Sequence, residues 1–88
     1  MSDAARNVTV RYFASVREGI GQEQEAVSTA AGTVGALRDE LIARGGAHAR
    51  VLARGRAVRI ALDHVMCDED AALTDAAEVA FFPPVTGG

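Results

Sequence analysis

The stretch EVAFFPPVTGG, residues 78–88, decides how this chain is organised. It starts with the apolar pattern of a buried β-strand and then meets two consecutive prolines, Pro83 and Pro84. A proline fixes φ at about −65° and has no backbone N–H donor, so a sheet ladder ends there. Proline also holds the preceding residue in extended geometry. The stretch predicts a last strand over 78–82 and an extended segment over 83–88.

The extended segment becomes narrower towards its end. Val85 and Thr86 are β-branched and favour extended backbone, and they are followed by Gly87 and Gly88, which have no side chain. A glycine pair can enter a channel that is too narrow for any other residue. We expect this tail to deliver the carboxylate of Gly88 into another protein's active site. The same Gly-Gly ending is also typical of a disordered terminus or a cloning remnant.

A reaction at the Gly88 carboxylate requires activation, because a free carboxylate is a poor electrophile. Conversion to an acyl-adenylate by ATP is one such activation, and a sulfide donor, a thiol or an amine can then displace AMP. The unhindered carbonyl of a glycine favours this attack.

Two adjacent aromatic residues, Phe81 and Phe82, precede the prolines. Neighbouring residues of a strand point to opposite faces, so only one of the two rings can lie in the core. With Phe81 inward, we expect Phe82 to be exposed and to form part of a partner interface. The alternative is that the chain itself covers the second ring.

Upstream of this stretch, alternation and helical spacing predict four further strands and two helices. The first strand has Val8, Val10 and Tyr12 on its buried face. The expected elements are a strand at 8–13, a short helix at 14–21, an edge strand at 22–28, the main helix at 33–44, a strand at 57–62, a return strand at 65–67 and the last strand at 78–82.

The main helix has the clearest amphipathic pattern. Thr33 is its expected N-cap, and the Gly45-Gly46 pair ends it. Its core face is formed by Val34, Leu37 and Leu41. The side chains that we expect on its solvent face are Arg38, Asp39, Glu40 and Arg44. The following stretch, 47–55, has no clear period and allows one more helical turn.

This order predicts an α+β fold, with one main helix packed on one face of a mixed sheet. We expect residues 1–88 to form a single domain, with 83–88 as a projecting C-terminal tail. If the first and last strands are adjacent and parallel at the centre, the arrangement is similar to the β-grasp fold of ubiquitin.

Composition excludes several classes of function. The net charge of −3 and the pI of about 5.2 argue against a nucleic-acid partner. No apolar run approaches the roughly 20 residues of a membrane span, and the start lacks a signal-peptide core, so we expect a cytoplasmic protein. Cys67 is the only cysteine, and we expect a passive thiol. The spacing of His48, His64 and Cys67 fits no common zinc pattern, and we expect no bound metal.

The ending FFPPVTGG at 81–88 closely resembles that of the sulfur-carrier small subunits of molybdopterin synthase, the MoaD family. The stretch VRYFASVRE at 10–18 resembles the family's first strand and helix. Further similarity lies at TVGAL (33–37), LTD (73–75) and EVAF (78–81). The resemblance thus spans nearly the whole chain.

The resemblance implies a β-grasp fold and a cycle of reactions at Gly88. A MoeB-like adenylyltransferase consumes ATP to form the glycyl adenylate, and a sulfur donor converts it to a thiocarboxylate. The tail, residues 83–87, then inserts into a MoaE-like large subunit, which holds the catalytic residues. Sulfur passes to cyclic pyranopterin monophosphate during molybdenum cofactor biosynthesis. The family assembles as a heterotetramer, and the carrier itself is not an enzyme and holds no stable cofactor.

The chain departs from this family in three places. Ala76-Ala77 stand where the family commonly has a glycine and an acidic residue, and Asp63-His64 replace an asparagine-containing turn. Residues 45–56 match poorly. Other readings also remain open: a sulfur carrier for thiamine or cysteine synthesis, a ubiquitin-like protein modifier, or an interaction module with an inert tail. The proline pair and the double phenylalanine favour the molybdopterin carrier.

Overall fold

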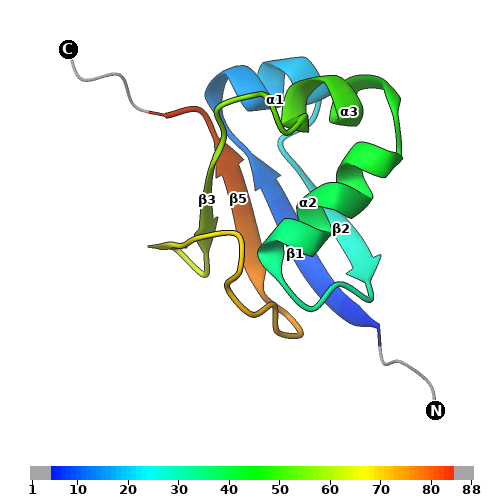
Figure 1. Ribbon diagram of the computed structural model, residues 1–88, viewed down its shortest axis with the longest axis vertical. Coiled ribbons are helices and arrows are strands. Elements are labelled where there is room, and N and C mark those ends of the chain that lie inside the picture. The colour runs from blue at the N-terminus through cyan, green and yellow to red at the C-terminus, as the bar shows by residue number, and fades with distance from the viewer. Residues whose placement is uncertain (1–4, 85–88) are drawn as a thin grey trace.

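The computed structural model describes residues 5–84, which form five strands and three helices (Figure 1). Every strand and helix that the sequence predicts is present, in the predicted order. The bounds are β1 Arg6–Tyr12, α1 Ala14–Ile20, β2 Gln24–Thr29, α2 Val34–Ala43, α3 Gly46–Leu52, β3 Arg59–Leu62, β4 Val65–Met66 and β5 Glu78–Phe82.

The five strands form one mixed sheet in the order β2-β1-β5-β3-β4. β1 and β5 are parallel neighbours at the centre, and the three remaining pairs are antiparallel. β2 lies at an edge and pairs with β1, as its polar sequence predicts. This topology is the β-grasp arrangement, so the predicted fold class is confirmed.

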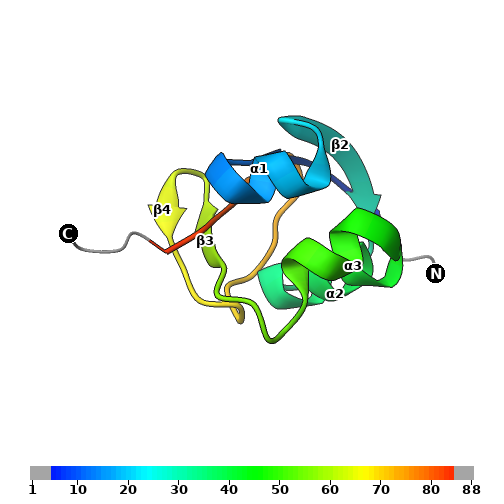
Figure 2. The same ribbon diagram turned by 90° about the horizontal axis from the view of Figure 1, so that it is seen from above.

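The core lies between the sheet and its helices. Figure 2 shows α2 and α3 on one side of the sheet, and α1 covers the end towards which β5 runs in Figure 1. The inward residues of the strands alternate with outward ones, as the sequence predicts. The buried hydrophobic residues that the strands contribute are Val8, Val10, Tyr12, Val27, Ile60, Val79 and Phe81, and the helices add Val16, Val34, Leu37, Leu41, Val51 and Leu52.

The main helix, α2, begins as predicted at Thr33, whose hydroxyl accepts a hydrogen bond of 3.1 Å from the Ala36 amide. The amide of Gly35 donates to the Glu69 carbonyl at 2.7 Å. A Cβ at position 35 would lie 3.0 Å from this carbonyl oxygen, so a larger residue would force the 68–71 segment to move away slightly. Tertiary contact therefore outweighs the helix propensity lost at Gly35.

Arg38 does not lie on the solvent face, contrary to the prediction. It is 4% exposed, and its guanidinium donates to the carbonyls of Leu52, Ala53 and Arg56 at 2.8–3.3 Å and to the Glu69 carboxylate at 2.6 Å. The sequence reasoning missed this because α3 follows α2 and covers the Arg38 side of that helix. Glu69, which lies in the acidic stretch 68–70, is consequently engaged in the fold.

Two turns, one before β5 and one between β3 and β4, lie where the sequence departs from the family pattern. Ala76 adopts φ +67°, a left-handed conformation that favours glycine, which the resembled family has here. Asp63 and His64 also have positive φ, of 49° and 70°, in the β3–β4 turn. The Asp63 carboxylate accepts a hydrogen bond of 2.9 Å from the Glu78 amide, which stabilises this turn.

Candidate functional site

The candidate site begins where β5 ends. Val79 and Phe81 of this strand are fully buried, and β1 and β3 hold it from both sides. The Phe13 amide donates to the Phe81 carbonyl at 3.1 Å, and Arg59 pairs in register with Phe82. The backbone is therefore fixed by hydrogen bonds up to the residue before the first proline. Pro83 and Pro84 therefore directly follow a strand at the centre of the sheet.

Strand β5 ends at Phe82, as the two prolines predict. Pro83 and Pro84 are half-buried beside the end of the sheet and belong to no strand. The remaining predicted tail residues, Val85, Thr86 and Gly87 with the reactive Gly88, lie outside the described residues. Their predicted roles stay predictions.

Phe82 is half-buried, so its ring is less exposed than the sequence predicts. It still lies on the face of the sheet opposite the helices, because its neighbour Phe81 points into the core. The most exposed large apolar side chains of the described residues are Phe13 at 39%, Val65 at 66% and Met66 at 53%. The sequence offered a signal for Phe13, since it follows the inward Tyr12 in the alternating pattern.

The open face of the sheet has a low centre and bulky edges. Its cross-strand register aligns Arg11, Ala80, Ala61 and Met66 in one row. The two alanines leave the middle of the row shallow, and the Arg11 guanidinium lies 5.4 Å from the centre of the Phe13 ring. An exposed aromatic and an exposed methionine beside a shallow centre are features of a protein-binding surface.

A polar network lies behind Phe81, on the helix side of β5. The Tyr12 ring stacks on Phe81 with 6.2 Å between centroids, and its hydroxyl donates to Glu25 at 2.6 Å. Arg44 at 2.7 Å and His48 at 2.9 Å contact the same carboxylate. Burial alone would raise the pKa of Glu25, but the hydrogen bonds from Tyr12, His48 and Arg44 outweigh it and lower this pKa to about 2. Glu25 is thus a permanent anion that joins β2, α2 and α3.

The other candidates from the sequence do not form a reactive centre. Burial, followed by the nearby Asp68 and Asp70, raises the pKa of Cys67, whose half-buried thiol contacts the Ile60 carbonyl at 3.9 Å. His64 is exposed and lies 3.6 Å from Glu78. Within residues 5–84, no three His, Cys, Asp or Glu side chains are placed to hold a metal. No helix in this range is long and apolar enough to cross a membrane.

Comparison with known proteins shows which proteins this chain is similar to. A sulfur carrier subunit of molybdopterin synthase from Escherichia coli is 41% identical over 81 residues, covering 92% of this chain and 99% of that protein. The solved structure of a putative subunit 1 of the molybdopterin converting factor from Pyrococcus furiosus is 27% identical. Its TM-score is 0.76, and the match covers 91% of this chain and 99% of that one.

A third similar structure is a protein–protein complex of subunits 1 and 2 of the molybdopterin-converting factor from Helicobacter pylori. The matched chain is 25% identical with a TM-score of 0.66, and the match covers 93% of this chain and 99% of that one. The ThiS family matches residues 10–88, from the centre of β1 to the glycine pair. The chain therefore belongs to the ThiS family.

Proposed function

We propose that this chain is the sulfur-carrier subunit of a molybdopterin synthase and that its reactive group is the carboxylate of Gly88. The observation that carries the proposal is the position of the sequence PPVTGG, which directly follows the central strand β5. The Escherichia coli relative with the same named role supports it over nearly the full length of both chains. In this proposal the chain holds no stable cofactor. The activating enzyme consumes ATP, and the partner proteins supply the catalytic residues.

The reaction has two steps on the carrier. A carboxylate oxygen of Gly88 attacks the α-phosphorus of ATP in a MoeB-like adenylyltransferase, and pyrophosphate leaves. A sulfur donor at the oxidation level of sulfide then attacks the glycyl carbonyl; the new C–S bond forms, the C–O bond to AMP breaks, and AMP leaves with the electron pair. The product is a thiocarboxylate. We expect both steps in the cytoplasm, where ATP is available.

The thiocarboxylate sulfur then forms a bond to cyclic pyranopterin monophosphate in a MoaE-like large subunit, and water cleaves the acyl C–S bond, which returns Gly88 to its carboxylate form. The Helicobacter pylori complex of subunits 1 and 2 supports a partner of this kind. In our proposal, the open face of the sheet with Phe13, Met66 and Phe82 docks on the large subunit. Docking of this rigid surface brings Pro83 and Pro84 to the entrance of its active site, and the narrow glycine pair enters.

Deletion of Gly88 tests the proposed function. The residue lies far along the chain from the core, so we expect unchanged unfolding and complete loss of molybdopterin formation in a reconstituted reaction. Substitution of Ala26, exposed on the edge strand β2, by serine is a control that should retain full activity. Normal molybdopterin formation by the deletion variant would contradict the proposal. Conjugates between Gly88 and lysines of other proteins would instead favour a ubiquitin-like modifier.

A further inference from the structure

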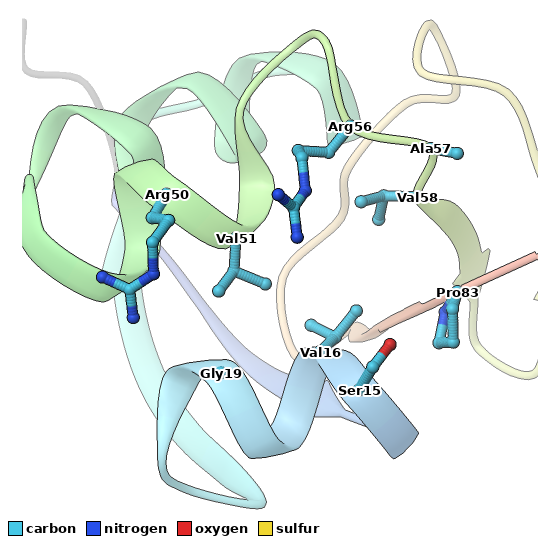
Figure 3. A pocket seen from close by; sticks show the side chains of 9 residues that line it. All are labelled: Ser15, Val16, Gly19, Arg50, Val51, Arg56, Ala57, Val58 and Pro83. Carbon is cyan, nitrogen blue, oxygen red and sulfur yellow. The ribbon is translucent and has the colours of Figure 1, made fainter.

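A hollow of about 160 Å³ lies directly beside the base of the tail. Its walls come from α1, α3 and the loop before β3, and Pro83 closes one side (Figure 3). We call it the tail-base hollow; it is lined by Ser15, Val16, Gly19, Arg50, Val51, Arg56, Ala57, Val58 and Pro83. A small-molecule site usually occupies roughly 300 Å³ or more, so this hollow fits one inserted side chain.

Gly19 creates the shape of the tail-base hollow. A Cβ at this position would lie 2.5 Å from Cγ2 of Val51, so α1 approaches α3 closely only because residue 19 has no side chain. The hollow has apolar walls, formed by Val16 of α1, Val51 of α3 and Val58 of the loop before β3.

Two guanidinium groups stand at these apolar walls without a partner among residues 5–84. Figure 3 shows the Arg56 side chain pointing towards Val51 and Val16, while Arg50 lies at the Gly19 end. Within residues 5–84, neither side chain makes a hydrogen bond or ion pair. The same is true of Arg17 and Arg59, which do not line the hollow, whereas Arg11, Arg38, Arg44 and Arg54 are all paired with carboxylates. The chain as a whole carries net charge −3, so these two free cations are not a consequence of a general excess of basic residues.

A partner that encloses the tail cannot avoid this hollow, because Pro83 is both the first tail residue and a wall of the hollow. A partner surface that covers the whole hollow, from Pro83 to the Gly19 end, therefore removes water from Arg56 and Arg50. A guanidinium that loses its water and gains no anion is strongly destabilising, whereas a carboxylate can pair with it through two parallel hydrogen bonds. The covering surface must supply that carboxylate.

We propose that the tail-base hollow receives an aspartate or glutamate side chain of the large subunit, which pairs with Arg56 and Arg50 when the carrier docks. This inference rests on the proposed function, because it concerns the protein that takes up the tail. It adds an ionic contact beside the tail, on the helix side of the molecule, to the apolar contact expected on the open face of the sheet. The two contacts together fix the rotation of the carrier about its tail.

Charge reversal tests this pairing by calorimetric titration of the unmodified carrier with the large subunit. We expect Arg56→Glu to weaken binding at least about tenfold and Arg50→Glu to weaken it similarly. Arg56→Lys keeps the charge and should retain most of the affinity. The control is Arg6→Glu, the same change at the start of β1, where the Arg6 side chain donates to the Ala31 carbonyl at 3.2 Å and does not line the hollow; it should alter affinity less than about twofold. Thermal unfolding of each variant checks its fold, and Arg50→Glu serves if Arg56→Glu does not fold.

Added salt should weaken the wild-type complex and have a smaller effect on Arg56→Glu. Equal loss in Arg56→Glu and Arg6→Glu, or no loss in either, would overturn the inference. A loss confined to the adenylyltransferase complex would also overturn it, because the acid would then belong to another partner. The titration uses the carboxylate form, so failure of sulfur uptake at Gly88 would contradict the proposed function alone. A wild-type carrier that does not bind the large subunit would overturn both.

Discussion

Arg38 and Arg56 are joined by a hydrogen bond of 3.3 Å from the Arg38 guanidinium to the Arg56 carbonyl, yet their side chains have opposite surroundings. Arg38 is buried and fully paired with Glu69 and with backbone carbonyls at the end of α3. Arg56 is exposed at the tail-base hollow and has no partner among the described residues. Arg38 thus fixes the backbone of the loop after α3, and Arg56 is a residue of that loop.

The difference separates charge that the fold uses from charge that it leaves for a partner. Around Arg38, the surrounding ionic groups are satisfied within the chain: Arg54 pairs with Asp39 and with Glu69. At the tail-base hollow, the guanidinium groups of Arg50 and Arg56 have no hydrogen-bond or ionic partner among residues 5–84. Because a buried unpaired charge destabilises a fold and a solvated one does not, the first region should control stability and the second should control binding.

The largest expected effect is that of Arg38→Leu on stability. This change removes the donor from the carbonyls of Leu52, Ala53 and Arg56 and leaves one oxygen of Glu69 unpaired, so we expect a loss of about 3–5 kcal/mol in the free energy of unfolding. Urea unfolding measures it. Arg17→Leu, at an exposed arginine of α1, should change stability by less than about 0.5 kcal/mol. A loss below about 1 kcal/mol for Arg38→Leu would remove the contrast between the two regions.

Phe82→Ala should show the reverse pattern, with its main effect on binding. We expect the complex with the large subunit to weaken by about 1–3 kcal/mol, the magnitude of an interface hot spot. Calorimetric titration measures this loss, and Ser28→Ala on the exposed edge strand is the control. Unchanged affinity with a large loss of stability would place Phe82 in the structural region instead.

Glu25→Gln probes a second fully paired charge. The pKa of Glu25 is lowered from 4.5 to about 2, so its carboxylate stabilises the fold above its ordinary pKa and this contribution disappears as pH falls towards 2. We expect the variant to lose about 1.5 kcal/mol near neutral pH, a typical value for hydrogen bonds to a charged group. The loss should shrink as the pH is lowered from 4.5 to 2. Urea unfolding across this range measures it, and a loss that stays constant with pH would contradict the account.

Gly19→Ala tests the junction of α1 and α3 below the tail-base hollow. Alanine improves helix propensity by about 1 kcal/mol, but its Cβ meets Val51, whose β-branched side chain has little rotamer freedom in a helix. Overpacking of this kind costs about 1–3 kcal/mol, so we expect a net loss of about 1 kcal/mol. Gly32→Ala is the control, because no atom lies within 4 Å of its added Cβ. Equal stability of both variants would mean that the hollow does not depend on this contact.

Much of the fold follows from local patterns in the sequence. Alternation placed Val10, Val79 and Phe81 in the core, and helical spacing did the same for Leu37 and Leu41. The prolines fixed the end of β5. These predictions hold because the period of a strand or helix determines which side chains share a face.

The sequence could not reveal contacts that depend on the order of segments in space. Arg38 reads as a solvent residue on α2 until α3 covers it, and Glu69 reads as part of an acidic loop until two arginines contact it. The tail-base hollow likewise joins residues from α1, α3, the following loop and Pro83. The chemistry expected at Gly88, in contrast, could be proposed from the last residues alone, because it depends on a bare terminal glycine and an extended approach.

Mass spectrometry of the intact carrier tests the central claim most directly. The protein is incubated with the adenylyltransferase, ATP and a sulfide donor, and the C-terminal peptide is then analysed. The account predicts exchange of one oxygen for sulfur at Gly88, dependent on ATP and absent from the variant that lacks Gly88. An unchanged terminal carboxylate under conditions in which the enzyme activates a related carrier would contradict it.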